Sequence, residues 1–340
     1  MTAHVNRSLP IRLGGIVVIA FLALLSIIFS VSIGSVDLPF SDIINLLAGN
    51  EGLSGDLNSS IIIMDIRLPR VITAFIAGAV LAVAGAAFQA LLRNPLADPF
   101  ILGVSGGAAL GGVLAIVSGF AFGAFSVQLS AFAGALATIV FVYFISRVDG
   151  RIPKYKMLLA GVVVNSFLSA LIMLVLSLAS EDSLASALFW LMGDLSGASW
   201  ERILGGLPWL AAGLIALYLM SKEMNLLLLG EDQARELGAN TERAKFLMFI
   251  AASLVTGVVV SACGLIGFVG LIVPHAARLI WGADHRFLIP ASFFLGGAFL
   301  TLSDTAARTV IAPVELPVGV ITALVGGPVF VYLMKKRLHE

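Results

Sequence analysis

The sequence predicts an all-α polytopic membrane protein, and three observations support that fold class. Only 12% of the 340 residues are charged and 59% are hydrophobic, whereas a soluble domain carries about 25% charged residues. The hydrophobic residues gather into runs of about 20, the helix length that crosses a bilayer. Lysine and arginine are concentrated in alternate gaps between these runs, a pattern that orients membrane helices.

The apolar runs predict about ten transmembrane helices within one domain that spans residues 1–340. The first run is too long for the apolar region of a signal peptide, so we expect it to be the first helix. The eighth run is shorter than a bilayer requires, and a half-helix or part of a re-entrant segment is the alternative there. The expected spans are 12–34, 68–92, 97–118, 122–146, 155–180, 203–222, 244–265, 271–283, 286–308 and 317–335.

Charge placement predicts a multi-pass protein of the cytoplasmic (inner) membrane with both termini cytoplasmic. Of the 20 lysines and arginines, only Arg67, Arg70, Arg202 and Arg308 fall in gaps assigned to the outside. Two longer hydrophilic stretches then lie on opposite sides of the membrane. Residues 35–66 are expected to form an external loop, with weak amphipathic character at 40–47, and residues 223–243 a cytoplasmic one.

Two segments align in a way that predicts an inverted repeat. Residues 77–95 match residues 256–274 without gaps, and the matched positions include Gly85 with Gly264 and Pro95 with Pro274. In the expected topology the two segments cross the membrane in opposite directions, as the halves of many transporters do. Chance matching among small apolar residues is the alternative.

The sequence carries none of the compact motifs of ATP binding, metal binding or hydrolysis. It has no G-x-x-x-x-G-K-[ST] loop, no H-E-x-x-H and no C-x-x-C, and its single cysteine, Cys263, cannot form an internal disulfide. The net charge of zero lacks the basic excess of a nucleic-acid-binding protein. An ion-coupled secondary carrier, a remoter alternative, needs mid-membrane carboxylates that are missing. We therefore expect no enzyme, no metal site and an external source of energy.

The 223–243 segment combines an apolar stretch with a short charged helix that we expect to stop at Gly238. Held outside the membrane, such a turn forms a peg for the groove of a cytoplasmic partner. An amphipathic helix lying on lipid is the alternative. The candidate contact residues are Leu228, Leu229, Gly230, Glu231, Asp232, Arg235, Glu236 and Gly238.

Arg67, Arg70 and Arg308 stand at the outer ends of the second and ninth spans, where cations are otherwise scarce. Arginine suits bidentate binding of carboxylates, so docking of an acidic surface of an extracytoplasmic protein is one interpretation. Interfacial snorkelling, or pairing with Asp65 or Asp304, is the other.

Asn165 and Ser166 are rare uncharged polar residues in the middle of the fifth span. Polar side chains at this depth either line a pathway or form hydrogen bonds between helices. The residues themselves leave both interpretations open.

Several strings, spread over nearly the whole chain, together resemble the permease family of type II ABC importers for iron–siderophore, heme and cobalamin. They are RLPR (67–70), GAAFQALLRNPLADPFILGVSGGAALG (85–111), FWLMGDLSGASW (189–200), LLGEDQARELG (228–238), GFVGLIVPHAARLIWGADHR (267–286) and DTAARTVIAPVELPVGVITALVGGPVFVYLM (304–334). The resemblance implies the ten-helix permease fold of that family, working as a homodimer.

The resemblance also implies partners and roles for the candidate residues. Two cytoplasmic ATP-binding subunits would carry the ATP and Mg, and would receive the 223–243 segment, called the coupling segment below. A periplasmic or extracellular substrate-binding protein would present carboxylates to Arg67, Arg70 and Arg308. The translocation path would follow the dimer axis beside the fifth span, near Asn165 and Ser166. The chain itself would bind no cofactor.

The substrate class is the finest inference that the resemblance allows. The string at 189–200 is more similar to iron-chelate permeases than to the cobalamin permease, so the expected cargo is a ferric siderophore. Cobalamin (vitamin B12) or heme carried by the same machinery is the alternative.

Overall fold

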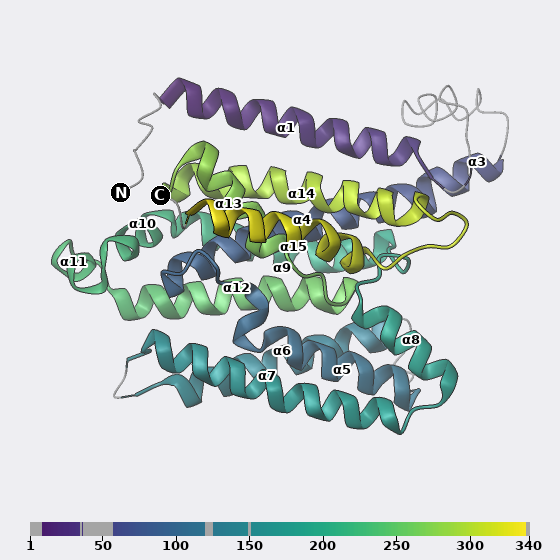
Figure 1. Cartoon of the computed structure of the whole chain (residues 1–340), viewed down its shortest axis with the longest axis horizontal. Coiled ribbons are helices and arrows are strands. Elements are labelled where there is room, and N and C mark those ends of the chain that lie inside the picture. The colour runs from purple at the N-terminus through teal and green to yellow at the C-terminus, as the bar shows by residue number, and fades with distance from the viewer. Residues whose placement is uncertain (1–8, 35, 37–56, 120–124, 149–150, 338–340) are drawn as a thin grey trace.

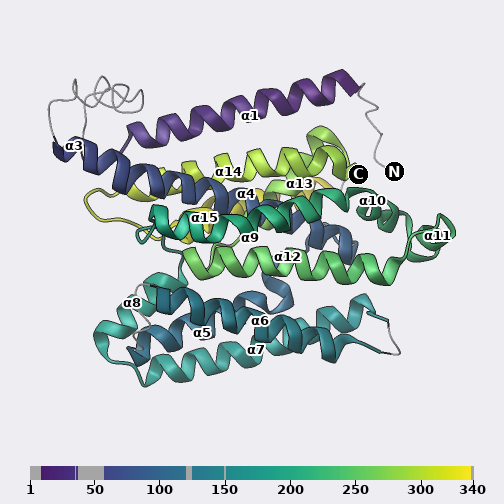
Figure 2. The same ribbon diagram turned by 180° about the vertical axis from the view of Figure 1, so that it is seen from behind.

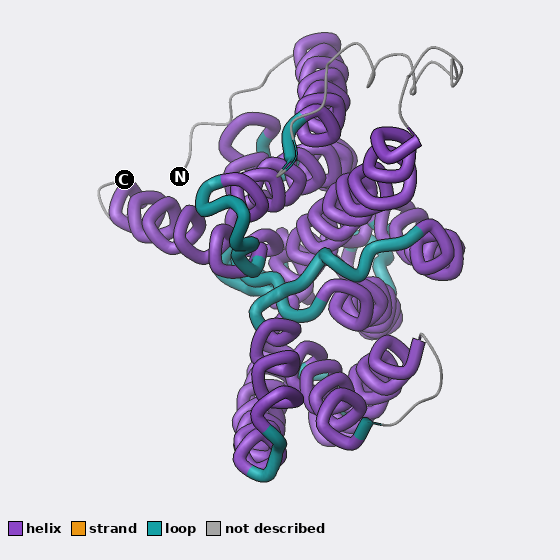
Figure 3. Tube along the Cα trace, turned by 90° about the vertical axis from the view of Figure 1, so that its right-hand side faces the viewer, coloured by secondary structure: helices purple, strands orange, loops and turns teal. Residues whose placement is uncertain are grey.

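The computed structural model describes residues 9–34, 36, 57–119, 125–148 and 151–337, and within these ranges it is built from helices without a β-strand (Figure 3). The first helices are α1 (Leu9–Ser32), α3 (Leu57–Ile61), the π-helix η1 (Ile62–Arg67), α4 (Leu68–Leu92), the 3-10 helix η2 (Pro99–Leu102), α5 (Val104–Ser118), α6 (Ser126–Ser146) and α7 (Lys154–Ser177). They are followed by α8 (Glu181–Leu191), α9 (Trp200–Leu219), α10 (Ser221–Leu229), α11 (Glu231–Glu236), α12 (Thr241–Cys263), α13 (Val269–Trp281), α14 (His285–Thr309) and α15 (Val318–Arg337).

The prediction of an all-α polytopic protein with about ten spans is confirmed. Seven helices of the described chain are long and apolar enough to cross a membrane, and three shorter apolar helices accompany them, at Val104–Ser118, Val269–Trp281 and Val318–Tyr332. Each of the ten expected spans corresponds to one of these helices. Whether the two aligned segments at 77–95 and 256–274 form an inverted repeat stays a prediction.

The predicted external loop at 35–66 is wrong for its last ten residues. Residues 57–67 are helical and continue into α4, so that one helix of 34 residues runs from Ser59 to Leu92. The apolar residues Ile61 to Met64 extend the helix beyond Asp65 and Arg67, which had marked its expected boundary. The amphipathic stretch at 40–47 lies outside the described residues.

Helix α13 begins at Val269, two residues earlier than expected, and holds Pro274 in its interior. A proline removes the hydrogen bond to the carbonyl four residues before it, which here is that of Gly270. The Gln89 side chain of α4 donates instead to the carbonyls of Gly270, at 3.4 Å, and Leu271, at 3.2 Å. The short eighth span is therefore a 13-residue helix. The carbonyl that Pro274 leaves without a backbone partner accepts a hydrogen bond from the side chain of Gln89 in α4.

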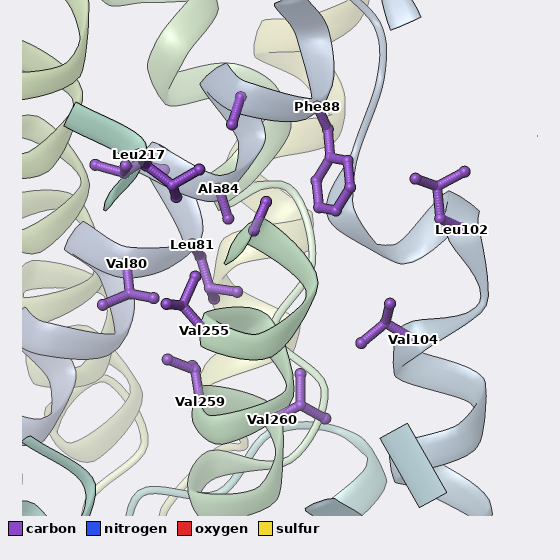
Figure 4. Packing of buried hydrophobic residues seen from close by; sticks show 14 of the residues in the cluster. Val80, Leu81, Ala84, Phe88, Leu102, Val104, Leu217, Val255, Val259 and Val260 are labelled. Atoms are coloured by element: carbon purple, nitrogen blue, oxygen red, sulfur yellow. The ribbon is translucent and has the colours of Figure 1, made fainter. Parts of the chain in front are cut away.

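Helix α4 is the centre of the bundle. Of its most apolar window, 78% is buried, compared with 17% for α7 and 11% for α9. Its side chains Val80, Leu81 and Ala84 pack against α12 and α9 in a continuous apolar core (Figure 4). In Figures 1 and 2, α1 lies along one side of this core and α5–α8 along the other, with α12 between α5–α8 and the central helices.

Glycines allow α4 to approach its neighbours at backbone distance. A Cβ atom added at Gly85 would lie 1.9 Å from the carbonyl oxygen of Gly270 in α13, and one at Gly78 would lie 2.2 Å from that of Gly296 in α14. Small residues let helices pack closely in lipid, where helix association depends on van der Waals contact. These two positions therefore fix how α13 and α14 sit on α4.

We expect Gly85→Ala to destabilise the protein by about 1–3 kcal/mol, the usual cost of overpacking, because backbone atoms of α13 cannot move out of the way as a flexible side chain could. Thermal unfolding in detergent measures the change. The matched control is Gly205→Ala in α9, where an added Cβ meets nothing within 4 Å. Equal stability of the two variants would show that α13 can move away at little cost.

The two ends of the bundle carry different groups of turns. One end, called the α11 face, holds the start of α1, the turns at 93–98 and 282–284, and helices α10 and α11. The other end, called the α3 face, holds α3, α8 and the 310–317 turn (Figure 1). Helix α15 runs back to the α11 face, so the described chain begins and ends at the same end of the bundle, as an even number of crossings requires.

Candidate functional site

Helices α10 and α11 form a compact projection at the α11 face (Figure 1). Gly230 joins them with a φ of 132°, and Gly238 ends α11 with a φ of 83°, conformations that glycine adopts without strain. The amide of Gly238 donates to the Arg235 carbonyl, and that of Ala239 donates to the Ala234 carbonyl. These two bonds make a Schellman stop, so the predicted short helix with Gly238 as its end is confirmed.

The structure places the candidate contact residues on this projection, most of them accessible. Leu229 is 55% exposed and Leu237, which the sequence analysis did not single out, is 62% exposed. The exposed candidates are Leu229, Asp232, Arg235, Glu236 and Gly238, and the half-buried ones are Leu228, Gly230 and Glu231. Apolar side chains therefore stand among charges on a short rigid helix, which is the arrangement of a peg. Which surface it meets is not set by these residues alone.

A buried lysine anchors α11 to the rest of the protein. The Lys245 ammonium lies 3.1 Å from a Glu231 carboxylate oxygen of α11 and 2.8 Å from Glu242, with its side chain only 4% exposed. Arg235 adds a 3.2 Å ion pair to Glu242. Sequence reasoning missed this cluster, although a lysine placed as the fifth residue of a membrane helix is itself a signal, because a charge at that position needs a partner.

A second anchor joins α10 to the start of α14. The Asn225 amide donates to Asp284 at 2.8 Å, and its oxygen accepts the His285 backbone N–H at 2.9 Å. Burial alone would raise the pKa of Asp284, but hydrogen bonds from Arg286 and Asn225 outweigh it and lower that pKa to about 2. Asp284 is therefore ionised at neutral pH and keeps its bond to Asn225. These residues, too, were missed by the sequence analysis.

The arginines expected at the outer surface are buried beneath the α3 face. Asp304, 1% exposed, accepts hydrogen bonds from Arg70 at 3.0 Å and from Arg308 at 2.9 Å. Arg70 also donates to Glu315 at 2.7 Å, and the Glu315 side chain is 35% exposed. The alternative of pairing with Asp304 is therefore confirmed for Arg70 and Arg308. Their docking role stays a prediction.

Arg67 is buried as well, with 4% of the residue exposed. It donates to the backbone carbonyls of Val31, at 3.3 Å, and Val36 at the end of α1. Arg67 thus closes the end of α1 onto the π-helix η1. A partner's carboxylate could reach it only after a local rearrangement.

Asn165 and Ser166 lie in the middle of α7 but on different sides of it. Asn165 is half-buried against α5, where a Cβ at Gly106 would lie 2.3 Å from its side-chain oxygen. Ser166 is exposed and its hydroxyl donates to the Val162 carbonyl within α7, at 2.9 Å. Ser166 belongs to an outward apolar face with Val162, Val163 and Phe167. The pathway role of both residues stays a prediction.

A small cavity lies inside the bundle. It lies between α4, α9 and α12, is lined by apolar side chains such as Leu210 and Val259, and measures about 60 Å³. Sites for small-molecule ligands measure about 300–1,000 Å³. This cavity is therefore smaller than a site for a small-molecule ligand.

The described chain forms a bundle of ten apolar helices with a projection of two short helices at one end, which is the architecture of a polytopic membrane protein. Residues 22–336 match the FecCD transport family, and the chain belongs to that family.

Related proteins cover most of this chain. It is 46% identical over 82% of its length to the cobalamin import system permease BtuC of Halobacterium salinarum, of which 74% is covered. It is 40% identical, with 82% and 84% covered, to the siderophore transport permease YfiZ of Bacillus subtilis. A solved structure described as a metal-chelate type ABC transporter in an inward-facing conformation matches with a TM-score of 0.83 and 32% identity, over 94% of this chain and 98% of that one.

These findings confirm the family that the sequence resembles and the permease fold. The chain is a multi-pass membrane permease of an ABC importer, and it is a transport subunit, not an enzyme.

Proposed function

We propose that the chain carries a ferric siderophore across the cytoplasmic membrane, as a homodimer driven by two ATP-binding subunits. The observation that carries the coupling to ATP is the projection of α10 and α11, with its exposed leucines and two anchors to the bundle. ATP and Mg belong to the partner subunits. Cobalamin or heme carried by the same machinery is the alternative, because relatives of similar identity bear the names of cobalamin and siderophore permeases.

The proposed orientation places the α11 face in the cytoplasm. This face holds Arg93, Arg147, Arg151 and Lys154, whereas the lysines and arginines of the α3 face are only Arg67, Arg70, Arg202 and Arg308 in the described chain. Cytoplasmic loops carry the excess of Lys and Arg in membrane proteins. Both termini then lie in the cytoplasm, and the α3 face is the side on which a binding protein delivers its cargo.

The translocation path is proposed to run between the two copies, beside α7. The exposed face of α7 around Ser166 is apolar over most of its length, and the 60 Å³ cavity within the bundle is too small for the cargo. Asn165, on the opposite side of α7, packs against Gly106 of α5. A weakly polar path of this kind has little selectivity, so the binding protein chooses the chelate.

Uptake into proteoliposomes that contain this chain, its ATPase and its binding protein tests the proposal. ATP-dependent accumulation of a ferric siderophore is expected, with no uptake when a non-hydrolysable ATP analogue replaces ATP. Accumulation of cobalamin or heme in the same assay would correct the substrate. Uptake that persists without ATP and collapses with an ionophore would instead make the chain an ion-coupled carrier.

Docking of the binding protein is proposed at the α3 face, where Glu315 controls access to Arg70. The Glu315 carboxylate already sits on Arg70, so a partner's carboxylate would have to displace it. Glu315→Gln is then expected to strengthen docking, by up to about fivefold, the worth of an exposed ion pair. Binding measured at low and high salt checks this, because charge-mediated docking weakens with salt. The control is Glu201→Gln, an exposed acid at the start of α9. Unchanged affinity would leave Arg70 with a purely structural role.

A further inference from the structure

We infer that Lys245 and Glu242 are positioning residues that hold the start of α7 to α11 and pass displacements of the coupling segment on to α7. The geometric part of this inference stands on the structure of the chain. Its consequence for transport rests on the proposed function above.

The two side chains hold both backbone polar groups of one residue. Ile152 donates its N–H to a Glu242 carboxylate oxygen at 2.9 Å, and its carbonyl accepts from the Lys245 ammonium at 3.1 Å. Ile152 is 5% exposed and lies two residues before α7 begins at Lys154. Two bonds at one residue fix its orientation as well as its position, which a single bond would not do. We call this arrangement the Ile152 clamp.

The clamp is continuous with the anchor of α11. An ammonium group has three N–H donors, and those of Lys245 have three partners: the Ile152 carbonyl, Glu231 and Glu242. The buried ammonium is therefore surrounded by three acceptors, of which the two carboxylates are half-buried. Because one ammonium group contacts all three segments, α11, the first turn of α12 and the start of α7 are expected to move together.

The clamp joins parts that are distant along the chain. Ile152 and Glu231 are 79 positions apart in the sequence, and α7 lies on the far side of α12 from α4 (Figures 1 and 2). The second anchor, from Asn225 to Asp284 and His285, leads to α14 instead. The coupling segment is therefore tied to the α5–α8 side of the bundle through Lys245 and Glu242, and to the central helices through Asn225 and through the Arg93 side chain, which donates to the Leu228 carbonyl at 3.5 Å.

This arrangement gives the clamp a specific task. A partner that pushes on α11 displaces Glu231, and Lys245 transmits that displacement to Ile152 and the start of α7. Helix α7 is the outward helix beside the proposed path, with 17% of its apolar window buried, so few contacts with the core resist its movement. Coupling through a two-state element requires such a physical connection between the sites.

The first arm of the test measures the clamp in the chain alone, in lipid nanodiscs. Spin labels are placed at Gln233→Cys in α11 and Tyr155→Cys in α7, both exposed positions, while native Cys263 is buried and unreactive. A narrow distance distribution is expected with the native clamp, and its loss is expected in Lys245→Met. The matched control, Arg243→Met, removes an exposed positive charge two residues earlier on the same helix and should keep the narrow peak.

The second arm measures uptake per ATP hydrolysed in the reconstituted complex. Lys245→Met is expected to lower this ratio by roughly fivefold or more, within the usual range of coupling between sites, while the ATP hydrolysis rate is retained. A merely structural role would lower uptake and hydrolysis together. If Lys245→Met does not yield folded protein, Glu242→Met carries both arms, since it removes the other half of the clamp from a more exposed position.

The outcomes separate this inference from the proposed function. A narrow peak and an unchanged ratio in both clamp variants would overturn the inference alone. Failure of the native complex to take up any chelate with ATP would overturn the proposed function, and the distance arm would still decide whether Lys245 and Glu242 hold α7 to α11.

Discussion

Asp304→Ala is expected to destabilise the protein more than any other single substitution beneath the α3 face. Asp304 is the shared partner of two buried guanidinium groups, those of Arg70 and Arg308, whose side chains are 11% and 5% exposed. Removing one partner of a buried ion pair typically costs about 3–5 kcal/mol, because the remaining charge is left uncompensated. That charge here is Arg308, since Arg70 keeps its ion pair with Glu315. The midpoint of thermal unfolding in detergent, and resistance to proteolysis, measure the loss.

The neighbouring carboxylate provides the matched control. Glu315→Ala removes the more exposed partner of Arg70 and leaves Asp304 in place, so its expected cost is below about 1 kcal/mol, the range of exposed ion pairs. Asp304→Asn, which keeps the shape and one acceptor, should fall between the two. If Asp304→Ala proved no more harmful than Glu315→Ala, water or a lipid headgroup would have to reach the two arginines, and the burial argument would fail.

Replacing both Leu229 and Leu237 with aspartate is expected to abolish assembly with the ATPase and, with it, ATP-driven uptake. These side chains are 55% and 62% exposed on the projection. Apolar residues at the centre of an interface cost about 2 kcal/mol or more when lost. Two of them correspond to an affinity lower by roughly a thousandfold. Binding of the purified ATPase to the permease in nanodiscs measures the effect.

The control variant replaces both leucines with methionine, which keeps apolar volume and is expected to retain most of the affinity. The same experiment decides between the two interpretations of the segment. If the aspartate variant binds the ATPase normally but its coupling segment no longer lies ordered on the lipid surface, the segment is an interfacial helix. The interpretation as a contact for the ATPase would then be wrong.

The sequence by itself determined the spans and the ends of several helices. Bilayer thickness requires runs of about 20 apolar residues, so the ten spans could be read from the chain without knowledge of their neighbours. The stop of α11 at Gly238 is local in the same sense, since it depends on a glycine that adopts positive φ. Local composition misled at residues 57–66, where Asp65 and Arg67 interrupt an apolar stretch that remains helical.

Only the tertiary structure decided the partners of the charged residues. Arg70 and Asp304 are 234 positions apart, and Lys245 and Ile152 are 93 apart, so no spacing rule connects them. The three outer arginines were expected to be accessible to a partner protein because few other charged residues lie near them in the sequence. Folding instead buries them against the ends of α1 and α14. A buried charge must find its counter-charge wherever the packed helices bring one. Which residue supplies it is a property of how the helices pack, not of the order of the residues.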